Sequence, residues 1–149
     1  MAVTGLSHFE RFFRETADLD VDKSDEKRYR EFVRHKIADL LVIGEARAKA
    51  DGRDIIERRD LPITKGLQET IHQFRRERVA AEVRPLLGEI ATVPMLDLDL
   101  AAETEESLPE IAGGLSLALG RTFKIVDPEL SNPSSDDWER AFRLFDLLL

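Results

Sequence analysis

The chain has 149 residues, of which 42% are hydrophobic, and this content is sufficient for one compact globular core. It contains no cysteine, which excludes disulfides, thiol nucleophiles and thiolate metal sites. The net charge of −8 is unevenly shared: residues up to Arg78 include 17 basic and 16 acidic side chains, and those from Val79 onward include 5 and 14. The two halves are therefore expected to face different surroundings.

No stretch of the sequence predicts a membrane protein. Apolar runs stay far below the roughly 20 residues that span a bilayer. The first eight residues lack the basic region and apolar run of a secretory signal. We therefore expect a cytoplasmic protein that has no contact with a membrane.

Helical periodicity dominates the first half of the chain. A short helix is expected from about Ser7 to Ala17, followed by a loop at residues 19–23 and a long helix from Ser24, its N-cap, to Ala50. Gly52 supplies a left-handed stop. A third helix is expected to begin at Leu61–Pro62 with Asp60 as its cap, and to fade by Arg78. The buried faces of these helices are predicted to carry Leu6, Phe9, Phe13, Tyr29, Val33, Ile37, Leu41, Gly44, Ala48, Leu67, Ile71 and Phe74.

The second half repeats this order of short, long and short helix. Residues 83–90 predict a short helix that Pro94 ends, and a long helix is expected from about Ala101 to Val126. Pro109 and the Gly113–Gly114 pair are expected to kink or loosen it. The loop at residues 127–135 leads to a last helix capped by Ser135. The segment 96–99 matches 19–22 at an offset of 77 residues, so an internal duplication is predicted.

This doubled plan resembles two histone folds in one chain, as in the bacterial histone-fold pseudodimers, whose function is uncharacterised. The resemblance is based on three segments, which are residues 19–23 (LDVDK), 60–69 (DLPITKGLQE) and 132–141 (NPSSDDWERA). It implies an all-α, single compact domain made of two histone-fold halves, about 6–78 and 79–149, which pair within the molecule. One half alone would expose the apolar side of its long helix, and crossing the two long helices buries both.

The same resemblance assigns a structural clamp. Histone folds pair an arginine in the loop after the long helix with an aspartate that opens the last helix, and Arg53 and Asp60 look like this pair. No arginine occupies the position in the second half that matches Arg53. The clamp is therefore expected in the first half alone.

Chemical motifs are sparse. The three histidines are scattered, so no catalytic or metal-binding pattern is predicted. The carboxylates at 103–106 do not argue for a metal, because carboxylates are common at helix starts. The aspartates at 18–25 do not argue for calcium, because this segment lacks the glycine and the final glutamate of a calcium-binding loop. We expect no enzyme, no cofactor and no metal.

Binding to DNA is weighed against binding to protein. Histone folds grip phosphates at paired loops, and DNA-wrapping members place lysine and threonine where this chain has Asp54 and Ile55. The other loops carry Asp20, Asp22, Asp97 and Asp99, which repel phosphates. One basic strip remains, with Arg11, Arg14, Lys27 and Arg28 as its candidates for DNA contact.

Two hypotheses follow. The first is a histone-fold module that binds a protein partner or self-associates without wrapping DNA. The alternative is a nucleoid-associated protein that binds DNA weakly through the N-terminal basic strip. Salt-dependent retardation of duplex DNA would separate them.

Overall fold

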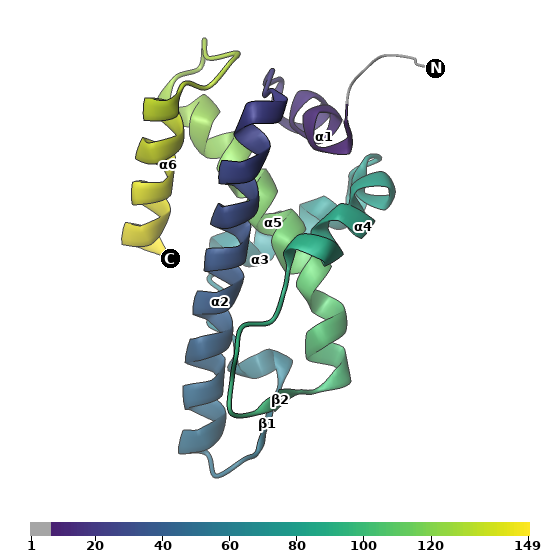
Figure 1. Cartoon of the computed structure of the whole chain (residues 1–149), viewed down its shortest axis with the longest axis vertical. Coiled ribbons are helices and arrows are strands. Elements are labelled where there is room, and N and C mark those ends of the chain that lie inside the picture. Colours follow the sequence, from purple (N-terminus) through teal and green to yellow (C-terminus); the bar gives the residue numbers. More distant parts are fainter. Residues whose placement is uncertain (1–6) are drawn as a thin grey trace.

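A computed structural model describes residues 7–149 as an all-α fold, with Leu6 of the predicted first apolar stripe lying outside the described residues (Figure 1). Two strands of two residues each, β1 (Ile55–Ile56) and β2 (Asp99–Leu100), join loops of the two halves. Over the described range the six helices are α1 (His8–Ala17), α2 (Glu26–Ala50), α3 (Lys65–Arg76), α4 (Ala80–Ile90), α5 (Ala102–Val126) and α6 (Ser135–Leu148). None of these helices has the length and apolar character that a bilayer span requires.

The two long helices α2 and α5 run in opposite directions and cross (Figure 1). At the crossing, the hydroxyl groups of Tyr29 and Ser116 form a buried hydrogen bond of 2.7 Å. Ser116 also donates to the carbonyl of Ala112 one turn earlier, so Tyr29 donates to Ser116. A buried polar pair that is fully bonded favours one register of the crossing over others.

The short helices cover the crossing from both sides. Phe9 and Phe13 of α1 pack on Tyr29 with ring centroids 4.9 and 5.4 Å apart. On α6, Phe142 stacks on Phe32 of α2 at 4.9 Å. Burying an aromatic side chain of this size contributes about 1.5–3 kcal/mol, so each amphipathic helix is held mainly by its apolar face.

Helix α3 packs closely along α5 because two glycines of α5 have no side chain in the way. A Cβ at Gly113 would lie 2.5 Å from the ring of Phe74, and one at Gly114 would lie 2.5 Å from Ile71 Cγ1 and 2.9 Å from its backbone nitrogen. Helix α5 is continuous from Ala102 to Val126, with Pro109 and both glycines inside it, so the predicted kink or loosening does not interrupt the helix. The glycines serve close helix packing.

Several predicted helix starts need correction. Ser24 does not cap α2: Asp22 accepts the Ser24 N–H at 3.0 Å and opens a 3₁₀ turn from Lys23 to Asp25, and α2 begins at Glu26. Ser134, one residue before the predicted cap, forms a capping box with Asp137 at the start of α6. In both places a residue earlier in the chain, with a side chain that commonly caps helices, has the extended backbone conformation that an N-cap requires.

Asp60 does not cap α3, whose first residue is Lys65. Thr64 accepts the Leu67 N–H at 3.2 Å and is the N-cap. The carboxylate of Asp60 is instead occupied by Arg53 and by the Glu57 N–H. Helix α3 ends at Arg76, before the predicted limit, and α4 ends at Ile90, four residues before Pro94.

Candidate interaction surfaces

Strands β1 and β2 bring a loop of the first half against a loop of the second. They pair in parallel, with Ile55 opposite Asp99 and Ile56 opposite Leu100. Beyond the strands, the carbonyl of Ile56 accepts from the Ala101 N–H and from the hydroxyl of Thr104, both at 2.9 Å. Together with Arg53 and Asp60 these residues form the surface that we call the β edge.

Arg53 and Asp60 form a bidentate ion pair at the β edge. The two terminal nitrogens of Arg53 lie 2.8 and 2.5 Å from the carboxylate oxygens of Asp60. The Asp60 side chain is only 5% exposed, whereas that of Arg53 is 20% exposed. Arg53 also donates to Asp51 at 3.0 Å and to Glu57 at 3.1 Å. The guanidinium is thus surrounded by carboxylates of its own loop.

These contacts shift both titrations. The Arg53 guanidinium, followed by the Glu57 N–H, outweighs burial and holds the pKa of Asp60 at about 2, below its ordinary 3.8. Hydrogen bonds from Arg53 to Asp60 and then to Asp51 raise the pKa of Arg53. Both groups are therefore charged throughout the neutral range.

Most other cations at the β edge are also paired inside the molecule. Lys49 lies 2.7 Å from Asp97, and this hydrogen bond raises the pKa of Lys49. Arg59 lies 3.0 Å from Glu57. A phosphate approaching this edge would have to compete with carboxylates that are already in place.

The opposite pair of loops is similarly acidic. The backbone N–H of Asp20 donates to the carbonyl of Ser131 at 2.5 Å, which places residues 18–22 beside the loop after α5. Arg14 forms an ion pair with Asp20, and Lys124 donates to the carbonyl of Leu130. The carboxylates of Asp127 and Glu129 are on the same loop as Leu130, at the protein surface.

The four residues of the predicted DNA-binding strip have different surroundings. Arg11 forms an ion pair of 3.0 Å with Glu82 of α4, and Arg14 is paired with Asp20. Lys27 is exposed and Arg28 is half-buried at the start of α2, and the described residues give neither of them an ion pair within 4 Å. Half of the strip is thus neutralised by neighbouring carboxylates.

An apolar groove, which periodicity did not reveal, lies between the start of α3, the C-terminal part of α5 and the end of α6. Its volume is about 230 Å³. Leu148 on its rim is 72% exposed, and an adjoining hollow continues from Leu67 to Ile43 of α2, which is 42% exposed. The residues that line the groove are Thr64, Gly66, Leu67, Ala118, Thr122, Leu144, Phe145, Leu148 and Leu149.

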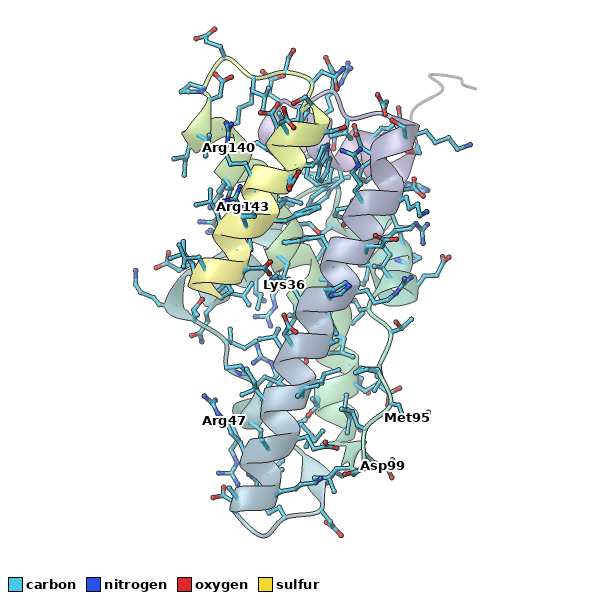
Figure 2. The ribbon with its side chains drawn as sticks, turned by 60° about the vertical axis from the view of Figure 1, so that its left-hand side comes forward. Lys36, Arg47, Met95, Asp99, Arg140 and Arg143 are labelled. Atoms are coloured by element: carbon cyan, nitrogen blue, oxygen red, sulfur yellow. The ribbon has the colours of Figure 1, made fainter. Side chains whose placement is uncertain are left out.

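A buried cation beside this groove was not predicted. Lys36, labelled in Figure 2, is 6% exposed. It forms an ion pair with Asp146 of α6, and Asp39 lies 3.7 Å from it. The apolar stripe of α2 includes a lysine at this point, and sequence periodicity assigned charged positions to the solvent. The pair fixes the end of α6 against α2.

The described residues contain no group of three or more histidine, aspartate or glutamate side chains arranged to hold a metal ion. Two further hollows, one around residues 93–100 and one along α3, are open surface depressions lined mainly by loop and helix-surface residues. The features that remain for function are the two loop edges, the apolar groove and the charged surfaces.

Fold and surfaces define an all-α protein in which loops of the two halves pair at both ends of the crossed long helices. Residues 9–146 match the family described as a domain of unknown function, DUF1931. The chain belongs to this family.

Two relatives in Aquifex aeolicus (strain VF5), each described as an uncharacterized protein, are 30% identical over 144 residues and 27% identical over 135 residues. The first alignment covers 95% of this chain and 82% of the relative, and the second 82% and 78%.

Two solved structures are similar. A crystal structure of a Thermus thermophilus protein has a TM-score of 0.85 and 51% identity, and 95% of each chain is covered. A crystal structure of an Aquifex aeolicus protein has a TM-score of 0.85 and 26% identity over 100% of this chain and 98% of that one.

Proposed function

We propose that this protein is a histone-fold pseudodimer that acts as a protein interaction and assembly module, without enzymatic activity and without wrapping DNA. Its partner is a protein, either a different one or another copy of the chain. The observation that carries the proposal is the exposed apolar groove between α3, α5 and α6. A concave surface lined mainly by apolar side chains, with a few polar groups, is the usual form of a binding site on a folded protein.

The pseudodimer itself is supported by the loop contacts. Each half would contribute one short, one long and one short helix, with the halves at about 6–78 and 79–149. The β edge joins the last loop of the first half to the first loop of the second, and the Asp20–Ser131 hydrogen bond joins the other two loops. This reciprocal pairing is what an internal two-fold relation requires.

Charge supports protein over DNA as the partner. At the loop edges, Arg53, Lys49 and Arg14 are each bound to carboxylates of the chain. Histone-like binding requires several cations to replace counterions on phosphates, and each of these would first have to leave its partner. Asp54 is also exposed where a phosphate would approach.

The alternative is weak DNA binding through the N-terminal strip. The observation in its favour is that Lys27 and Arg28 have no ion pair within the described range. Two cations would release few counterions from DNA, so the gain in binding free energy would be small and binding would be weak and confined to low salt.

A site-specific photocrosslinker tests the proposal in cells of the native host. At Leu148 the probe would lie on the groove rim, and at Glu139, nine residues earlier, it would point to the opposite side of the same helix. We expect discrete protease-sensitive adducts at Leu148 and none at Glu139. Equal adducts at both positions would refute the groove as the interface.

A third probe at Lys27 tests the alternative in the same experiment. Protein binding through the groove leaves Lys27 without adducts. Nuclease-sensitive adducts at Lys27, with none at Leu148, would overturn the proposal in favour of DNA binding.

A further inference from the structure

The outward face of α3 contains a hollow of about 450 Å³ rimmed by basic side chains. Lys65, Arg75 and Arg76 belong to α3, and Arg58 reaches the hollow from the turn before it. His72 lies on the same side and is exposed. This surface, which we call the α3 hollow, contains one carboxylate, Glu69, among its lining residues.

Two of these cations lack a partner in the described structure. Lys65 is paired with Glu69 at 2.9 Å, and Arg75 with Glu110 at 2.6 Å. Arg58 and Arg76 have no carboxylate within 4 Å among residues 7–149. The side-chain oxygen of Gln73, which also lines the hollow, is buried without a hydrogen-bond partner. Two guanidinium groups on the rim of the α3 hollow are thus without an anion, and the side-chain oxygen of Gln73 is without a hydrogen-bond donor.

The segment before β2 has the opposite character. Met95 is 100% exposed and Val93 is 44% exposed, and a depression of about 590 Å³ around them is lined also by Asp99 and Glu105. Figure 2 shows Met95 and Asp99 on the same edge of the molecule, directed away from the helices. Four exposed carboxylates in and just after this segment form no ion pair in the described part of the chain, namely Asp99, Glu103, Glu105 and Glu106.

We propose that the α3 hollow of one molecule binds the Met95 segment of a second copy, so that copies associate head to tail. The segment around the exposed methionine would enter the hollow, and the carboxylates around it would meet Arg58 and Arg76. The surfaces lie on different faces of the molecule: α3 lies behind α5 in Figure 1, and the segment before β2 lies in front. One molecule can therefore use both at once.

Charge complementarity selects this occupant. A segment surrounded by unpaired carboxylates matches a hollow rimmed by unpaired arginines, and every copy of the chain carries both surfaces. Two copies of net charge −8 repel at a distance, but at about 0.15 M salt charges interact over only about 8 Å. The local pairs are then the electrostatic contacts that count.

Because the two contact surfaces differ, the association is heterologous and does not stop at two copies unless a ring closes. This separates it from association through the apolar groove, where both copies could use the same surface. It also gives opposite salt responses: at about 1 M salt the ion pairs are screened, whereas burial of the groove is not weakened. The inference uses surfaces other than the apolar groove that carries the proposed function, so either can fail without the other.

Sedimentation equilibrium of the full chain tests the proposal. We expect the weight-average mass to rise with concentration at about 0.15 M salt and to fall to that of the monomer at about 1 M. A hollow variant, Arg58→Gln with Arg76→Gln, and a loop variant, Asp99→Asn with Glu105→Gln, should each remain monomeric. Mixed in equal amounts they should form a 1:1 pair and nothing larger, since each supplies the surface that the other lacks.

Matched control variants carry the same changes elsewhere. Arg140→Gln with Arg143→Gln neutralises two exposed arginines of α6 (Figure 2), and Glu129→Gln with Glu139→Gln neutralises two exposed carboxylates. Both should associate as the unmodified chain does. A wild-type monomer at every salt concentration, unchanged association of either test variant, or a mixture that stays monomeric would each overturn the proposal. Loss of association through Leu148→Glu alone would assign it to the groove.

Discussion

Breaking the ion pair between Arg53 and Asp60 should destabilise the fold measurably. In Arg53→Met the Asp60 carboxylate, 5% exposed, loses both of its guanidinium bonds and keeps the Glu57 N–H. Removing one partner of a buried pair costs about 3–5 kcal/mol. Because the Arg53 side chain is 20% exposed and water can reach the site, we expect a loss of roughly 2–4 kcal/mol.

The pH dependence gives a second estimate of the same interaction. The pKa of Asp60 is about 2 in the folded chain against an ordinary 3.8, and this difference corresponds to about 2 kcal/mol. Because the folded pKa is the lower one, this stability is fully present above about pH 4. It is lost as the pH falls from there through about 2. The difference between wild type and Arg53→Met should shrink over the same interval.

Urea unfolding of four chains measures these terms: wild type, Arg53→Met, Asp60→Asn and the double variant. The double variant should lose less free energy of unfolding than the two single losses combined, because it leaves no unpaired charge buried. Strictly additive losses, or a difference that does not change between about pH 4 and 2, would refute the reasoning.

Three further outcomes are expected. Gly114→Ala should cost about 1–3 kcal/mol, because its Cβ would clash with Ile71, whereas Gly66→Ala in open space should not destabilise; thermal unfolding compares the two. A fragment ending at Arg78 should be unfolded or self-associated in sedimentation and circular dichroism, and a stable monomer would contradict the dependence of each half on the other. Mobility shifts should show no DNA compaction at physiological salt, and replacing Asp54 and its neighbour with lysine and threonine should tighten the weak binding seen at low salt.

The helices were predictable because their apolar residues recur with helical spacing. The long helix predicted from Ser24 to Ala50 forms from Glu26 to Ala50, and Gly52 has the expected left-handed conformation with φ at 71°. Cap positions were less predictable. Aspartate, serine and threonine all serve as caps, and which one does so depends on the backbone and on competing partners, as Asp60 shows.

Features that form only when the two halves of the chain meet could not be predicted from the periodicity of apolar residues. The strands β1 and β2 are two residues long and carry no alternation of their own, since Ile55 and Asp99 meet only after the halves pair. The apolar groove is formed by residues of three helices and required the tertiary arrangement. The sequence predicts weak points within a helix at Gly113 and Gly114, because it shows the missing side chains and not the neighbouring helix that needs the space.

The chain has one tyrosine and one tryptophan, and their positions allow unfolding to be followed by their intrinsic absorbance and fluorescence. Tyr29 belongs to the first half and Trp138 to the second, and both are at most 1% exposed. Burial raises the pKa of Tyr29, so its phenolate absorbance in an alkaline titration marks the opening of the helix crossing. Trp138 emission reports separation of α6 from Phe123, 5.0 Å away. If the tyrosine and tryptophan signals change together, the two halves unfold cooperatively, and any separation between the two transitions measures how weakly their unfolding is coupled.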